Sequence, residues 1–185
     1  WLWIKERTST SNHMVMDSSR AGDYNRIMPN KADAEITSDP AVLPLTDGFS
    51  VASSDGGLNQ ASQTYVAWQW VANGGTTTTN DASSTGVGTI DSVYQANTTA
   101  GFSILTYTGT GSAGTIAHGL GSTPQVIITK DRGAVENWVV HHHTLGATFI
   151  MRMDDNVAKV DAASYNDTLP TSTVFSVDAG GNNQS

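Results

Sequence analysis

Short apolar segments alternate with polar, turn-forming stretches along the whole chain, and this pattern predicts β-strands. Most of the segments end at Gly, Pro, Asn, Asp or Ser, whereas an amphipathic helix needs a longer apolar stripe at three- and four-residue spacing. Thr and Val, which suit a pleated sheet, are plentiful, and the helix formers Leu, Glu, Lys and Arg are sparse. We therefore predict an all-β fold, an antiparallel β-sandwich. Its strands are expected near residues 1–5, 13–17, 48–52, 64–71, 101–108, 114–118, 125–130, 137–143, 147–153 and 173–178.

Alternation within TYVAWQW (residues 64–70) predicts which side chains share a face. Successive residues of a strand point to opposite sides, so Val66, Trp68 and Trp70 lie on one face. We expect that face to enter the core. The pattern is weakest in residues 18–47 and 154–172, where ADAE (32–35) and DNVAKVDAA (155–163) predict short helical turns.

Several motifs occur twice in the same order, which predicts an internal repeat. The offset is close to 125 residues, as from Lys5 to Lys130. We assign residues 1–71 to a first unit, 72–92 to a polar linker or long loop, and 93–185 to a second unit. The matched motifs are IKER and TKDR, HMVMD and WVVH, GFSV and VFSV, and NQAS and NQS.

Each unit is expected to be cut at one end of the chain. WLWIK already has the pattern of a strand interior, and the second copy stops where the first continues into YVAWQW. We expect the remaining strand of the second unit to lie beyond Ser185, or to come from another unit or a partner chain by strand complementation.

Charge and cysteine content exclude several classes of function. The net charge is −8, and only nine Lys and Arg residues are spread over 185 positions. Phosphate backbones and anionic membranes need clustered cations, so we expect no nucleic-acid partner and no membrane insertion. The sequence contains no cysteine, which excludes disulfides and thiolate metal sites.

Two segments carry metal-ligand residue types. Imidazoles suit Zn, Ni or Cu, but strand alternation puts only His141 and His143 on one face, with no carboxylate nearby in sequence, which favours a polar strand face. The oxygen-rich run Asp154, Asp155 and Asn156 could contribute to a Ca²⁺ shell, and a solvated turn is the alternative. No cofactor is assigned with certainty, and Ca²⁺ is the candidate.

Aromatic residues suggest ligand binding rather than catalysis. Trp138 follows a polar residue and a loop, and we expect it to be exposed as a platform for a sugar ring. Tyr107, His141 and His143 complete the candidate ligand-binding set, whereas the other tryptophans are expected in the core. The sequence has no Gly-x-Ser-x-Gly elbow, P-loop or dinucleotide fingerprint, so we expect no enzymatic activity.

The run TAGFSILTYTGTGSAGTIAHGLGSTPQVIITKDR (99–132), with Trp138, Leu145-Gly146 and the upstream YVAWQW, resembles a known family. It is similar to a repeated domain of tail-fibre-like and other virion structural proteins of marine bacteriophages. The resemblance implies a concanavalin-like or jelly-roll sandwich on the virion surface and provides no catalytic residues.

These expectations favour a fibre or adhesin module that binds host-surface glycan or protein through several weak copies. The expected partners are other virion proteins in a homo-oligomer such as a trimer. A purely structural capsid decoration or stalk-building module is the main alternative, and a glycan-cleaving domain is the least favoured.

Overall fold

The computed structural model describes residues 1–20, 25–37, 42–51 and 57–184. These residues form fourteen β-strands, the four-residue helix α1 (Ala82–Thr85) and two 3₁₀ turns, η1 (His143–Leu145) and η2 (Ala163–Tyr165). Every paired strand is antiparallel to its neighbour. The all-β prediction is therefore confirmed. None of the helices in this part of the chain is long and apolar enough to cross a membrane.

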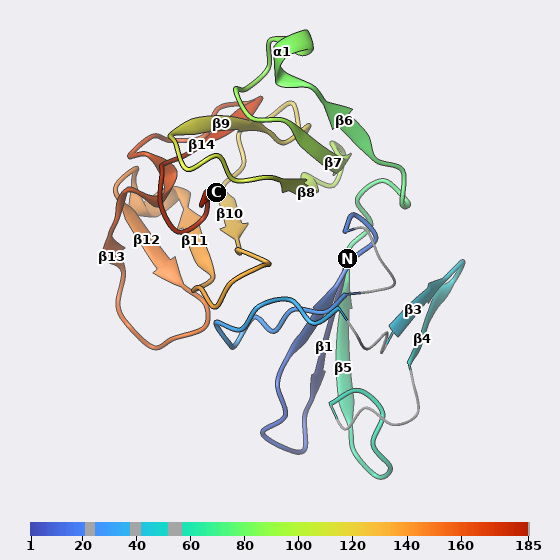
Figure 1. Cartoon of the computed structure of the whole chain (residues 1–185). Helices are drawn as coiled ribbons and strands as arrows, with labels where there is room; N and C mark the ends of the chain where they lie inside the picture. The colour runs from blue at the N-terminus through green and yellow to red at the C-terminus, as the bar shows by residue number, and fades with distance from the viewer. Residues whose placement is uncertain (21–24, 38–41, 52–56, 185) are drawn as a thin grey trace.

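The described residues up to Val71 form a first lobe, which occupies the lower part of Figure 1. Its strands β1 (Leu2–Glu6), β2 (Met14–Met16) and β5 (Tyr65–Gln69) make one sheet in the order β2-β1-β5. The hairpin of β3 (Val42–Leu45) and β4 (Gly48–Val51) makes a second sheet. Side chains from both sheets meet in one core: Ile4, Met14, Met16, Met28, Val42 and Leu58, flanked by Leu2, Ile36, Phe49, Val51 and Tyr65.

The second lobe contains three sheets around a separate core, in the upper part of Figure 1. Their orders are β6-β7-β8, β14-β9 and β10-β11-β12-β13. The strands are β6 (Thr78–Asn80), β7 (Ser92–Asn97), β8 (Phe102–Tyr107), β9 (Gly114–Ala117), β10 (Val126–Thr129), β11 (Val139–His142), β12 (Phe149–Arg152), β13 (Val160–Asp161) and β14 (Val174–Val177). The core consists of Ile90, Ile116, Val139, Ile150, Tyr165, Phe175 and Val177.

A third, smaller apolar cluster joins the lobes. Val15 and Ile27 of the first lobe pack against Trp138 of the second, with Trp1 and Trp3 at the margin. Burial of this apolar surface stabilises the contact between the lobes.

All the expected strand positions contain a strand, and four further strands were missed. Two of the missed strands are short, since β6 is Thr-Thr-Asn and β13 has two residues, whereas β3 is Val-Leu-Pro-Leu, in which a proline interrupts the strand pattern. β7 buries Ser92 and Gln95, whose polar groups are satisfied inside the protein, so its sequence lacks an apolar face. The expected helical turns were wrong, because ADAE is irregular and DNVAKVDAA contributes β13 before η2 begins at Ala163.

The polar segment 72–92 holds β6 and α1. Asp81 caps α1 by accepting hydrogen bonds from the amides of Ser83 and Ser84. Ile90, near the end of the segment, is buried in the second core.

Two glycines of the HGLG turn share a backbone conformation but differ in their surroundings. Gly119 has φ +72°, and a Cβ there would lie 2.2 Å from Cε2 of Tyr94. Gly121 has φ +70°, and a Cβ there would meet no atom within 4 Å.

We expect Gly119→Ala to destabilise the protein by at least about 2 kcal/mol more than Gly121→Ala. Both variants carry the strain of a left-handed conformation, roughly 1 kcal/mol, but only Gly119→Ala also overpacks against the Tyr94 ring. Urea unfolding of the two variants measures the difference, and equal midpoints would contradict the tight approach to Tyr94.

Candidate functional site

The structure buries Trp138, which corrects the expectation that it is exposed. Its side chain is 5% exposed, and its indole N–H donates to the carbonyls of Met28 and Lys31, at 3.0 and 3.1 Å. A polar residue before the tryptophan was a poor guide, because the surface that covers it comes from a distant part of the chain.

The histidine run does not form one face. His141 is 1% exposed, whereas β11 ends at His142 and His143 begins η1 on the exposed surface. The strand alternation assumed for all three residues stops too early to place His143 beside His141. Burial, and then the neighbouring histidines, lower the pKa of His141, and its Nε2 atom has no hydrogen-bond partner among the described residues.

We expect His141→Met to reduce the loss of stability in mild acid. The unfolded chain takes up the proton near pH 6.5 while native His141 stays neutral, so native stability is full above that pH and falls below it. His118 contributes in the same sense, because burial also lowers its pKa. Urea unfolding between about pH 7.5 and 5, roughly the range in which histidine titrates, measures this effect. Over that range the free energy of unfolding should fall less for His141→Met than for wild type.

The exposed His143→Met is the matched control for that experiment and should change the pH dependence of stability far less than His141→Met, because burial, the main cause of the lowered pKa of His141, stays in place. A profile for His141→Met that falls as steeply as the wild type would show that His141 does not drive the acid sensitivity.

The proposed calcium residues are used in local hydrogen bonds. Asp154 accepts from the Trp138 amide at 2.8 Å and from the Asn137 side chain at 2.9 Å, and Asp155 accepts from the Val157 amide. Asn156 is exposed. The described residues contain no group of three or more His, Cys, Asp or Glu side chains that could hold a metal ion.

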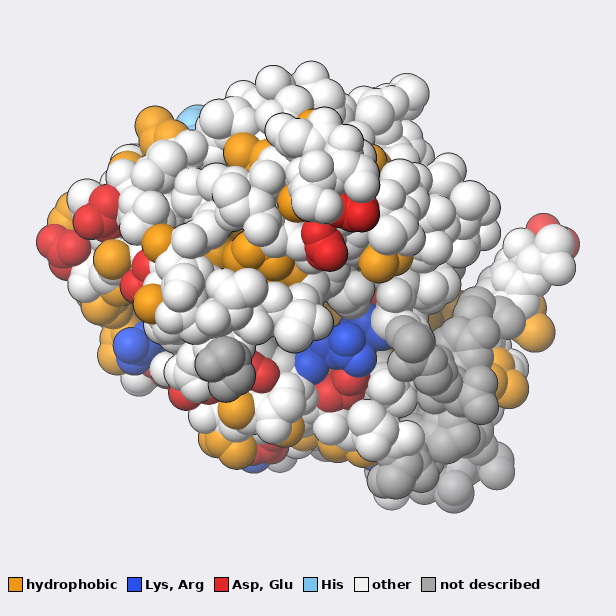
Figure 2. Space-filling model, turned by 45° about the horizontal axis from the view of Figure 1, so that its top comes forward, with side chains coloured by type: hydrophobic (Ala, Val, Ile, Leu, Met, Phe, Trp, Pro, Cys, Tyr) orange, Lys and Arg blue, Asp and Glu red, His pale blue; other side chains and the backbone are white. Residues whose placement is uncertain are grey.

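Tyr107 lines a polar pocket of about 280 Å³ together with Asp91, Thr106 and Arg132. Its hydroxyl donates to the Asn182 carbonyl, and burial raises its pKa, so the phenol stays neutral. The pocket offers mainly hydroxyl groups. On the face of the molecule drawn in Figure 2, basic side chains gather near the middle, with acidic side chains above and below them.

An exposed aromatic surface lies on the first lobe. Trp3 is directly opposite Trp68 in the β1–β5 ladder, and the Trp70 amide donates to the Trp1 carbonyl at 2.9 Å. The four indoles therefore share one face of the sheet. Trp68 and Trp70 are 43% and 41% exposed. We call Trp1, Trp3, Trp68, Trp70 and Phe102 the tryptophan face.

This arrangement corrects the assignment of Trp68 and Trp70 to the core. The opposite face of β5 meets the first core through Tyr65, as Ile4 does on β1. The alternation was right, but on the face opposite the tryptophans only Tyr65 packs against the core, and Ala67 and Gln69 are exposed.

Ring packing holds the tryptophan face together across both lobes. Trp1 lies 4.8 Å from Trp70 and 5.7 Å from Trp3 between ring centroids, and Trp3 lies 5.8 Å from Trp68. Phe102, from β8 of the second lobe, stacks on Trp70 at 6.2 Å. Such edge and offset contacts orient rings without covering their outer surfaces.

His13 supports the same face. The Trp3 indole N–H donates to Nδ1 of His13 at 2.8 Å, so that nitrogen must be unprotonated. Burial, and then the positive charge of Lys5, lower the pKa of His13 and favour this state.

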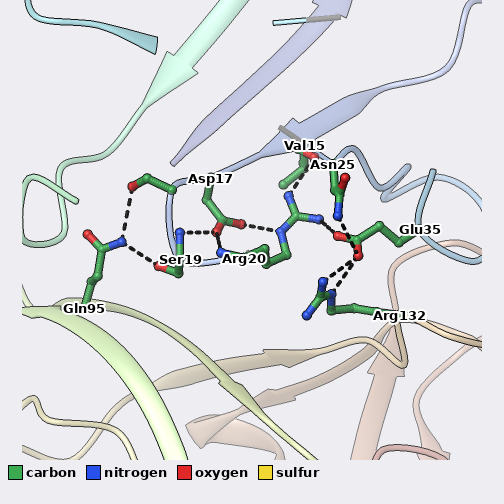
Figure 3. Close-up of polar contacts among 9 residues, drawn as sticks. Val15, Asp17, Ser19, Arg20, Asn25, Glu35, Gln95 and Arg132 are labelled. Carbon is green, nitrogen blue, oxygen red and sulfur yellow. Dashed lines mark hydrogen bonds and ion pairs between the residues drawn. The ribbon is translucent and has the colours of Figure 1, made fainter. Parts of the chain in front are cut away.

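A buried charged network joins the lobes beside this surface (Figure 3). Glu35 accepts from Nη1 of Arg20, and from Nε and Nη2 of Arg132 at 2.9 and 2.6 Å. Arg20 also donates to Asp17 at 2.8 Å. The side chains of Asp17, Arg20 and Glu35 are 4–5% exposed, so these charges depend on one another for stability.

Gln95 extends the polar contact between the lobes. Its side-chain amide donates to the hydroxyls of Ser18 and Ser19, at 3.2 and 2.9 Å. The junction therefore combines ion pairs, neutral hydrogen bonds and the apolar contact of Trp138.

We expect Glu35→Gln to lower the free energy of unfolding by about 3 kcal/mol, because it leaves the buried Arg20 without one of its two carboxylates. Glu136→Gln, which changes the net charge equally and removes no ion pair recorded among the described residues, should change it by less than about 0.5 kcal/mol. Denaturant unfolding measures both variants, and equal effects would show that the network is not a stabilising contact.

The four tryptophans of the tryptophan face were expected in the core, and their grouping was not predicted. The available signal was the spacing of Trp1 and Trp3, and of Trp68 and Trp70, two residues apart within strands. That spacing predicts a shared face on each strand, but the pairing of β1 with β5 across more than 60 residues is not visible in a single sequence.

The fold and this surface define an all-β protein with an exposed aromatic face and a charged junction between two lobes. Over residues 1–185 the chain matches the family model of a domain of unknown function, DUF7483, and belongs to that family. Searches of curated proteins and of solved structures gave no match.

Proposed function

We propose that this protein is a bacteriophage virion-surface module, fibre-like or adhesin-like, that binds host-surface glycan through the tryptophan face. The exposure of Trp68 and Trp70 in an ordered array of rings is the observation that carries the proposal. An indole offers a flat apolar surface that stacks on the apolar face of a sugar ring. The low density of charge favours a neutral polar ligand over a charged one. The proposal assigns no catalytic step to the protein.

The proposed architecture is a pair of β-sandwich units related by a repeat of about 125 residues. β1 pairs with β2 at Ile4 opposite Met14, and β10 pairs with β11 at Thr129 opposite Val139. Each residue of the second pair stands 125 positions after its counterpart. A chance similarity of sequence would not be expected to preserve a pairing register, because a slip of one residue reverses every side chain.

Two lysines support the same repeat. Lys5 donates through Nζ to the carbonyls of Glu6 and Ser9, and Lys130 donates to those of Asp131 and Ala134. In each case the acceptors are the next residue and the residue four positions later. A later pair of phenylalanines also fits the repeat. Phe49 of β4 packs against the first core, and Phe175 of β14 lies in the second core.

A structural role in a stalk or capsid decoration is the second candidate, and the charged junction favours it. Arg7, 125 positions before Arg132, is exposed, so a glutamate of a preceding unit would pair with Arg7 as Glu35 pairs with Arg132. The proposed partners are other virion proteins and further copies of the chain, in a homo-oligomer such as a trimer. A position on the capsid lattice in micrographs of the intact particle would support this role, and a distal tip position would support adhesion.

Alanine at Trp68 or Trp70 should weaken glycan binding by about tenfold or more, because loss of a central aromatic contact costs about 2 kcal/mol. The probe is an array of bacterial surface oligosaccharides, followed by titration calorimetry with the best ligand. Trp68→Phe should retain most of the affinity.

Leu169→Ala is the matched control, since Leu169 is 52% exposed and lies outside the tryptophan face. Circular dichroism checks that each variant is folded. Absence of binding to every glycan by the assembled wild-type protein, or binding that is insensitive to both tryptophan changes, would overturn the proposal.

A further inference from the structure

The open edge of β10 corresponds to an edge of β1 that is occupied. β1 lies between β2 and β5, whereas β10 has β11 on one side and is paired with no other strand of the described residues. The register places Trp1 and Trp3 at the positions that Val126 and Ile128 hold in β10.

Hydrogen bonding shows which groups of β10 point outward. The His143 amide donates to the Gln125 carbonyl, so Gln125, Ile127 and Thr129 direct their backbone groups toward β11. The amides and carbonyls of Val126 and Ile128 therefore lie on the open edge. The corresponding residues of β1 bond to β5, as the Trp70 amide does to the Trp1 carbonyl.

The side chains beside this edge are apolar and uncovered. Val126 and Ile128 are 47% and 46% exposed. In β1 the matching side chains, Trp1 and Trp3, are partly covered by Trp70 and Trp68. An exposed edge with apolar side chains is a surface that pairs readily with another strand.

The far end of the edge limits how long an added strand can be. The Glu35 amide donates to the Arg132 carbonyl at 2.9 Å, so the first lobe already occupies the edge there. The free part runs from Val126 to Lys130, which matches the five residues of β5.

We infer that the open edge of β10 binds an extended partner strand of the β5 type, with aromatic side chains at alternate positions. The strand runs antiparallel to β10, with its tryptophan opposite Ile128 as Trp68 is opposite Trp3. Main-chain hydrogen bonds provide the affinity, and the alternate aromatic side chains provide the register. This inference rests on the repeat and not on glycan binding by the tryptophan face.

The test uses the whole chain and a synthetic peptide with the sequence of residues 64–70, TYVAWQW. Hydrogen exchange followed by NMR should show slower exchange of the Val126 and Ile128 amides, by about tenfold when the peptide is at ten times its Kd. The amides of β1 should not change, because their partner strand is already in place.

Two singly N-methylated peptides provide the matched control. In the β1–β5 ladder, residues 64, 66, 68 and 70 direct their amides toward β1, and the residues between them do not. Methylation at the position of Trp68 should therefore weaken binding at least about tenfold, the effect of losing roughly 1.4 kcal/mol. Methylation at the position of Ala67 should change the affinity far less.

Ile128→Trp, which copies Trp3, should tighten peptide binding by adding an aromatic pair across the strands. The inference is overturned if TYVAWQW leaves the Val126 and Ile128 amides unprotected, or if the two methylated peptides bind equally well. A negative glycan array with positive peptide binding would remove the adhesin proposal and leave this inference intact.

Discussion

The carboxylate of Glu35 fixes the relation between the two lobes, and the tryptophan face depends on that relation. Burying a carboxylate is costly unless several donors satisfy it, and Arg20 and Arg132 do so from opposite lobes. The Glu35 amide adds a backbone bond to Arg132. With the lobes held in this way, Phe102 from the second lobe reaches Trp70 and Trp1 on the first. The aromatic surface is thus assembled across a junction whose stability comes from buried charge.

Local pattern was enough to locate strands but not to decide which of their faces is buried. Every expected strand was found because short apolar runs and turn residues are local signals. The inner face of β5 was predicted wrongly, because the larger side chains were assumed to be core. The indoles instead pack against Trp1 and Trp3 on a strand more than 60 residues away, and Tyr65 faces the core. The opposite error was made at Trp138, which was predicted to be exposed. It is buried, and its indole N–H donates to the carbonyls of residues 28 and 31.

The buried polar positions explain why some strands and site residues could not be predicted. Gln95 is 1% exposed in β7, and His141 is 1% exposed in β11, yet both residue types normally indicate surface. Hydroxyls of Ser18 and Ser19 satisfy the Gln95 amide. In the proposed repeat His141 corresponds to Met16 of the first lobe, and both side chains are buried, so the repeat would require a side chain of this volume rather than an imidazole. Whether a polar residue is buried depends on tertiary contacts, which the sequence alone does not show.

In the proposed function, one type of strand edge would connect assembly with binding. In the first lobe the edge of β1 is used by β5, and that pairing is what brings Trp68 and Trp70 beside Trp1 and Trp3. In the proposed repeat the corresponding edge is that of β10, which pairs with no second strand of the described residues, and Val126 and Ile128 take the positions of Trp1 and Trp3. A strand of the β5 type added there would carry its own indoles onto the second lobe. Each unit joined through β10 would then create another aromatic surface, so that growth of the assembly would raise the number of weak contacts available to a glycan-coated surface.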